Sequence, residues 1–232
     1  AKYNTYYNGE LAYIEGIDAQ EKANKDNYSE IIPLFMTGNK ATVSAGKSNF
    51  ERAIEKCQKT IKQHSITKRP EWKSNKPKTQ KDKIWLSQKE YNPFLHNAWF
   101  LMADAQFHKG EYLEAAMTYS YIQQLYFSKP DIVAKARMLE AKCYAEMEWF
   151  YDAEDVINRA MRDSFPAKYD HLKASALAAS QIRQGLYEDA IPNLKLAIKK
   201  EDGLQKSRMY FLLGQLYHKV GKDDLAYKAF KK

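Results

Sequence analysis

The stretch "GEYLEAAMTYSYIQQLY" at residues 110–126 decides the fold, because its glycine, alanine and large residues recur at matching offsets along the chain. The same order of turn, small anchor and large residue appears in "EWFYDAEDVINRAM", "GLYEDAIPNLKLAI" and "GKDDLAYKAFKK". The small anchors are 38, 37 and 36 residues apart, at Ala115, Ala153, Ala190 and Ala226. The sequence is therefore a repeat, with a period near the roughly 34 residues of one known helical-hairpin unit.

Each residue of the pattern has a packing role in such a hairpin. Gly110 allows a sharp turn between two helices, because glycine accepts positive φ without a steric penalty. Ala115 permits close approach of the second helix to the first, and Tyr119 fills the space one turn later. One hairpin cannot bury its own apolar face, so the units must stack. The pattern predicts an all-α, right-handed superhelical solenoid of antiparallel helix hairpins of the tetratricopeptide-repeat (TPR) type.

The repeat also predicts the organisation of the chain. The front is less regular: a degenerate hairpin has its second helix in "NFERAIEKCQKTIKQHSI", residues 49–66, after a long inserted loop. An apolar run in that loop, residues 31–35, is expected to pack back onto the helices, since it would be sticky if exposed. The expected units are the degenerate hairpin at 2–66, a basic connecting loop at 67–91, and four hairpins at about 92–129, 130–167, 168–203 and 204–232.

Composition limits the possible classes of protein. A chain of 232 residues with 44% hydrophobic and 28% charged residues can bury a substantial core. Its apolar runs fall short of the roughly 18 residues that a membrane span needs, and no signal segment opens it. Because the sequence begins without methionine, we expect a trimmed product whose targeting segment is missing. Cys57 and Cys143 lie in apolar helical patterns and are expected to be buried small hydrophobes.

The sequence contains no recognisable catalytic or metal-binding motif. Its five histidines lie far apart, and none belongs to an HExxH motif or a His/Cys cluster. There is no phosphate-binding loop and no nucleophile elbow. Acidic residues such as Glu114 and Glu188 stand at expected helix starts, where they favour the helix dipole. We predict that the protein is not an enzyme and uses no cofactor or metal.

The first helices of the hairpins are expected to line a concave face that could bind a protein partner. The expected contact residues mix aromatic, methionine and charged side chains, which suits an extended peptide or a partner helix but is also compatible with an unused face. They do not reproduce the Lys/Asn/Arg clamp with which some TPR modules hold a C-terminal carboxylate. The projected set is Asn97, Phe100, Asp104, Phe107, Lys135, Met138, Lys142, Arg208, Phe211 and Gln215.

The net charge of +8 is concentrated in one segment. Residues 67–89 contain eight basic and two acidic residues, hence +6. Tryptophans among lysines could stack on bases while the lysines neutralise phosphate, so a nucleic-acid-binding repeat protein is the alternative function. The preferred interpretation is a solvated lysine-rich excursion, because the charge does not continue along the repeats. The candidate residues of this segment are Lys68, Arg69, Trp72, Lys73, Lys76, Lys78, Lys81 and Lys83.

Four stretches in chain order carry a family resemblance: "KYNTYYNGELAYIEG" (2–16), "DNYSEIIPLF" (26–35), "AIEKCQKTIKQHSI" (53–66) and "EYNPFLHNAWFLMADAQFHKGEYLEAA" (90–116). They resemble the N-terminal region of TPR lipoproteins of Bacteroidota, the PorW/SprE-like proteins associated with type IX secretion and gliding motility. The specific part is residues 2–66, with the "YYNG" opening and the "HSI" end, because the later units match TPR proteins in general.

The resemblance implies a function that packing alone does not. It implies a non-enzymatic scaffold at the periplasmic side of the outer membrane, with protein partners in a secretion, motility or other envelope assembly. It also implies a lipid anchor on a cysteine before Ala1, and a C-terminal part beyond Lys232, because family members are usually longer. The family offers no catalytic residues to transfer.

Overall fold

The computed structural model describes residues 3–38, 40–72, 75, 77–163 and 165–232. Within these residues the chain is all-helical and contains no strand, as the repeat predicts. The helices are α1 (Asn4–Ala23), α2 (Lys40–His64), α3 (Gln80–Leu86), α4 (His96–His108), α5 (Tyr112–Leu125), α6 (Pro130–Glu146), α7 (Phe150–Arg162), α8 (Asp170–Arg183), α9 (Tyr187–Ile198), α10 (Gly203–Lys219) and α11 (Asp223–Phe230), with short 3-10 turns η1 (Met36–Gly38) and η2 (Ala167–Tyr169).

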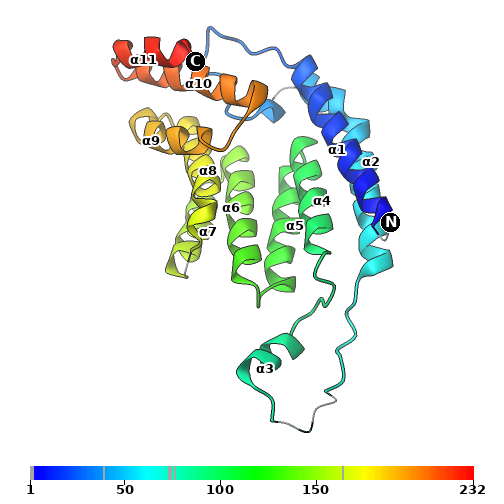
Figure 1. Ribbon diagram of the computed structural model, residues 1–232. Helices are drawn as coiled ribbons and strands as arrows, with labels where there is room; N and C mark the ends of the chain where they lie inside the picture. The colour runs from blue at the N-terminus through cyan, green and yellow to red at the C-terminus, as the bar shows by residue number, and fades with distance from the viewer. Residues whose placement is uncertain (1–2, 39, 73–74, 76, 164) are drawn as a thin grey trace.

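Consecutive helices pair into hairpins, and the hairpins stack in chain order (Figure 1). The pairs are α1 with α2, α4 with α5, α6 with α7, α8 with α9, and α10 with α11. Neighbouring pairs are joined through α2 with α4, α5 with α6, α6 with α8, and α9 with α10. Since each hairpin buries its apolar face on the next one, the core runs along the row of helices rather than forming a single centre.

The turns inside the hairpins use a left-handed residue. Gly110, Gly185 and Gly221 have φ of 83°, 74° and 73°. At the equivalent turn between α6 and α7 the chain has Glu148, with φ of 62°. The repeat pattern therefore extends to the backbone, and one of its units keeps the turn without glycine.

Replacing Glu148 with glycine should stabilise the protein by about 1 kcal/mol, because a non-glycine residue in the left-handed region costs about 1–2 kcal/mol. The ion pair that Glu148 makes with Arg183 spans 3.5 Å on the surface and offsets little of that gain. Urea unfolding would measure the change. Gly185→Ala is the matched reverse substitution, since φ there is 74° and a Cβ would meet nothing within 4 Å; a stability gain in that variant would contradict the explanation.

The second helix of the first hairpin is longer than the sequence pattern suggests. It begins at Lys40, whereas the expected helix began at residue 49, so residues 40–48 are not part of a loop. The small residues there serve close packing: a Cβ on Gly46 would lie 2.4 Å from the Phe50 ring and 2.9 Å from the Gly16 carbonyl oxygen. The inserted loop is correspondingly shorter.

The first hairpin is joined to the second around His108, at the end of α4. Its ring stacks on Phe50 at 5.8 Å between centroids, and Gln20 donates a hydrogen bond of 2.6 Å to its carbonyl oxygen. Burial, with a further contribution from the Lys142 charge, lowers the pKa of His108 to about 3. The imidazole is therefore neutral at physiological pH and acts as a packing residue.

The basic connection between α2 and α4 is not wholly a loop, which corrects the expectation for residues 67–91. It contains α3, which is opened by a capping box between Thr79 and Asp82. The base of the excursion is closed by the buried Glu90, whose carboxylate accepts hydrogen bonds from the Ser65 hydroxyl (2.6 Å) and from the backbone N–H groups of Ile66 (2.9 Å) and Asn92 (2.7 Å). The two ends of the excursion are thus held together.

Candidate functional site

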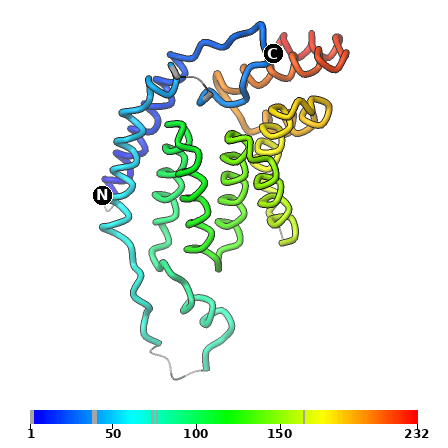
Figure 2. Tube along the Cα trace, turned by 180° about the vertical axis from the view of Figure 1, so that it is seen from behind, coloured from blue at the N-terminus to red at the C-terminus, as the bar shows by residue number. Residues whose placement is uncertain are grey.

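The candidate site is the surface where residues 24–38, here called the strap, lie against the helices. The strap leaves α1, extends across to α10 at the other end of the stack, and returns through η1 to α2 (Figures 1 and 2). We call the surface of α4, α6, α8 and α10 that it contacts the first-helix face. The strap thereby joins parts of the chain that are more than 170 residues apart in sequence.

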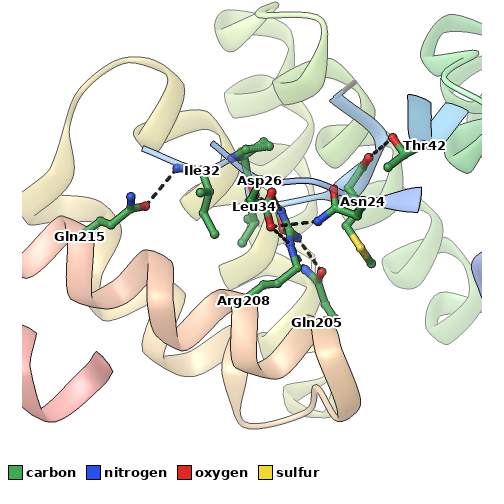
Figure 3. A network of polar contacts seen from close by, with 10 residues as sticks. Asn24, Asp26, Ile32, Leu34, Thr42, Gln205, Arg208 and Gln215 are labelled. Carbon is green, nitrogen blue, oxygen red and sulfur yellow. Dashed lines mark hydrogen bonds and ion pairs between the residues drawn. The ribbon is translucent and has the colours of Figure 1, made fainter. Parts of the chain in front are cut away.

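A buried ion pair anchors the strap on α10 (Figure 3). The Arg208 guanidinium donates to the Asp26 carboxylate through Nε (2.6 Å) and Nη2 (2.8 Å), and the two side chains are only 4% and 3% exposed. Burial alone would raise the pKa of Asp26, but the hydrogen bonds and charge of Arg208, with help from Asn24, hold it below its ordinary value. Asp26 is therefore ionised, and the two-point geometry fixes the position of the strap.

Three side chains of α10 bind the backbone of the strap (Figure 3). Arg208 Nη2 donates to the Pro33 carbonyl oxygen at 3.0 Å, and Gln205 Nε2 donates to that of Leu34 at 2.8 Å. Gln215 accepts from the Ile32 N–H at 3.0 Å through Oε1 and donates to the Glu30 carbonyl oxygen at 2.5 Å through Nε2. These bonds recognise an extended backbone rather than particular side chains.

Apolar side chains of the strap complete the core, as expected for residues 31–35. Ile32 and Leu34 are buried in one cluster with residues of α8, α9 and α10, including Ala178, Leu194 and Leu212. Beside them lies a cavity of about 230 Å³ bordered by Ile31, Arg183 and Tyr187, among others. The prediction that this run packs back onto the helices is confirmed.

The second part of the strap contacts α4, α5 and α6. The Phe35 ring meets Phe107 edge-on at 5.5 Å, and the Lys142 ammonium lies 3.8 Å from the Phe107 ring centroid and 5.0 Å from that of Phe35. The Tyr112 hydroxyl donates to Thr37 Oγ1 at 2.9 Å. The strap therefore contacts hairpins along most of the stack.

Five of the ten residues projected onto the concave face do contact the strap. Phe107 and Lys142 hold Phe35, Arg208 and Gln215 bind the backbone, and Phe211 meets the ring of Tyr28 at 4.9 Å. These side chains are engaged by the chain itself.

The other five are not among these strap contacts, and two of them, Phe100 and Met138, correct the projection because they are buried. Met138 is fully buried in a cluster between α6, α7 and α8. Phe100 is also buried, and the Lys135 ammonium lies 4.3 Å from the centroid of the Phe100 ring. Asp104 accepts a hydrogen bond from the Tyr119 hydroxyl, and Asn97 is half-buried near the start of α4. Phe100 and Met138 are core residues and do not form an open surface.

Sequence reasoning missed three residues that define the site. Gln205 lies three positions before Arg208 on the same helical face, so the spacing could have indicated it. Tyr112 belongs to the repeat stretch at residues 110–126, but that pattern does not indicate its bond to Thr37. Asp26 gave no signal, because its partner is 182 residues away and neither residue belongs to a local motif.

The basic segment is exposed where the structure describes it. Lys68, Arg69, Lys78, Lys81 and Lys83 are exposed, whereas Trp72 is half-buried. Lys73 and Lys76 lie outside the described residues. Trp85 keeps 44% of its surface exposed and meets Tyr91 at 5.6 Å, so its ring is partly used to fix α3.

Among the described residues, burial is the main cause of the pKa shifts of the buried titratable groups. Burial raises the pKa of the Cys57 thiol to about 12 and moves that of Cys143 in the same direction. Burial also raises the pKa of Glu140, against hydrogen bonds from Gln123 and Tyr144. No group of three or more His, Cys, Asp or Glu residues placed to hold a metal ion occurs in the described part of the chain. None of its helices is both long and apolar enough to cross a membrane.

Comparisons with known proteins bear on the fold. No family model matches the chain, and no curated protein matches it. The crystal structure of BtubC (BKLC) from P. vanneervenii is similar with a TM-score of 0.51 and 15% sequence identity, covering 98% of this chain and 89% of that one. At this identity the likeness bears on the fold alone: this all-helical chain is similar to a helical-repeat structure.

Proposed function

We propose that this chain is a TPR solenoid that acts as a non-enzymatic scaffold for protein partners. One observation carries the proposal: the first-helix face already holds an extended segment by hydrogen bonds from Gln205, Arg208 and Gln215 to its backbone. Helical solenoids present extended surfaces of this kind to peptides and helices. The backbone bonds of the strap support the proposal, because a partner peptide would use bonds of the same kind.

We further propose that the scaffold belongs to an outer-membrane-associated secretion or motility assembly of the type IX kind, at the periplasmic side and held by a lipid anchor outside these residues. This step rests on the resemblance of residues 2–66 to the PorW/SprE-like lipoproteins. Most of the stretches that carry it lie together: Tyr3 stacks on Phe94 at 4.0 Å and meets His64 at 5.1 Å. Three of the four stretches thus meet at one place, whereas residues 26–34 lie against α10.

Site-specific photo-crosslinking in a native envelope extract tests the proposal. A photoreactive amino acid replaces Lys135 on α6, a projected contact residue that is not among those engaged by the strap, or, as the control, the exposed Lys62 on α2. Adducts are identified by mass spectrometry. We expect discrete envelope-protein adducts from position 135 that survive nuclease treatment and are absent from position 62. Equal adducts from both positions would overturn the proposal.

A third crosslinking position, Lys81 in the basic segment, separates the alternative function from the scaffold. Nucleic acid crosslinked there, and removed by nuclease, would favour the nucleic-acid-binding repeat protein and contradict both the compartment and the scaffold. Protein adducts restricted to position 135 would exclude that alternative under the same conditions.

A further inference from the structure

A second surface, on the last two hairpins, has the form of a ligand groove. Helix α10 lies between α9 and α11 and contacts both (Figure 1). Between the two flanking helices is a groove of about 300 Å³ whose floor includes Leu213 and Tyr217 of α10. We call it the lysine groove because Lys195 and Lys199 line it on one side and Lys228 and Lys232 on the other.

The lysine groove and the strap use opposite sides of α10. The strap contacts Arg208 and Gln215, whereas the floor of the groove is formed by Tyr210, Leu213 and Tyr217. Residues two positions apart on an α-helix point about 200° from each other, which places the two sets back to back. The groove is therefore independent of the first-helix face.

The four lysines are arranged as two pairs of like charge. Within each pair the residues are four positions apart, and both line the groove. All four are exposed, and within the described residues none takes part in an ion pair. Lys232 lies over the Tyr210 ring at 5.0 Å. A groove lined by one sign of charge over apolar walls concentrates a positive potential and attracts anions.

The space between the lysines is apolar. Ile198, Leu213 and Ala229 line it, together with Leu225, which is 41% exposed. A comparable groove on α7 and α8 lacks this charge, because Glu154 and Lys173 line it together. Of these two grooves, the one on the last two hairpins alone combines four lysines with an apolar floor.

We propose that the lysine groove binds an acidic peptide segment that inserts a large apolar side chain between α9 and α11. Carboxylates on both sides of the inserted side chain meet the two lysine pairs, and the apolar side chain displaces water from the floor. A nucleic acid would meet the lysines through its phosphates, but the aliphatic side chains of Ile198, Leu213 and Leu225 give its bases no stacking surface. The groove therefore favours a peptide.

Fluorescence anisotropy with a defined probe tests the groove. The probe is a fluorescein-labelled twelve-residue peptide of Glu and Asp with one Trp and one Leu at its centre. The proteins are the wild type, the double variant Lys195→Glu/Lys228→Glu, and a control of equal charge change on α2, Lys59→Glu/Lys62→Glu. Circular dichroism confirms that each variant keeps its helices.

We expect saturable binding by the wild type, binding weakened about tenfold or more in the groove variant, and a change of less than about twofold in the control. Replacing Trp and Leu of the probe with Ser should also weaken binding about tenfold. The proposal is overturned if no saturable binding occurs, if both variants weaken it equally, or if an oligodeoxynucleotide of the same charge competes as well as the acidic peptide. None of these results would bear on the proposed partner binding at the first-helix face.

Discussion

Replacing Asp26 with alanine should lower the free energy of unfolding by about 3–5 kcal/mol, because it leaves the Arg208 guanidinium buried without its counter-ion. The pair is almost completely removed from water, with side chains 4% and 3% exposed. Arg208 would keep only its bonds to strap carbonyl oxygens and to Gln205, which carry no full charge. Urea unfolding followed by circular dichroism measures the loss.

Two controls separate the ion pair from other effects of this substitution. Asp18→Ala removes the same group from an exposed position on α1 and should change stability by less than about 0.5 kcal/mol. Asp26→Ala combined with Arg208→Met should recover part of the loss, since no unpaired charge remains buried. Equal losses in the Asp26 and Asp18 variants would show that the strap is not held by this pair.

The ion pair between Asp26 and Arg208 should make part of the free energy of unfolding depend on pH in the acidic range. Since the pKa of Asp26 is lower in the folded state than its ordinary value of 3.8, its contribution is complete above that pH. It is lost as pH falls below 3.8, through the folded pKa. The difference in stability between wild type and the Asp26→Ala variant should therefore narrow in that range and stay constant above it.

Replacing Phe50 with alanine should also cost about 3–5 kcal/mol, because the ring is fully buried and its removal leaves a cavity. The ring lies against Gly16 and Gly46 and stacks on His108, so it joins both helices of the first hairpin to α4. Hydrogen exchange should show the largest loss of protection in α1 and α2. Phe127→Ala, at a site 51% exposed, is the matched control and should change stability by less than about 1 kcal/mol.

The helices after residue 92 could be predicted because their packing signals are local. The recurring anchors and turns give the four later hairpins to within a few residues, and even the left-handed turn at Gly110 follows from its residue type. The start of α2 could not be located in this way. Its first turns are rich in small residues, which indicate a loop until their partners, Phe50 and Gly16, are known.

The candidate site could be predicted only in part. The 3.6-residue period identified Arg208, Phe211 and Gln215 as neighbours on α10, because that relation is local. It could not show that residues 26–34 would cover them, since a contact over about 180 residues leaves no periodic trace. The register failed at Met138 because α6 is packed on more than one side, so its apolar residues do not mark a single surface.

The strap also changes how this molecule can fold. In a linear array of hairpins, contacts are nearly all between sequence neighbours, so folding spreads from unit to unit and the ends fray first. Here the hydrogen bonds from residues 26–34 to residues 205–215 connect the first hairpin of the array directly to the last one. Long-range closure raises the contact order and slows folding. During synthesis Ile32 and Leu34 emerge long before α8, α9 and α10, the helices that cover them, so they remain uncovered until those helices have been made.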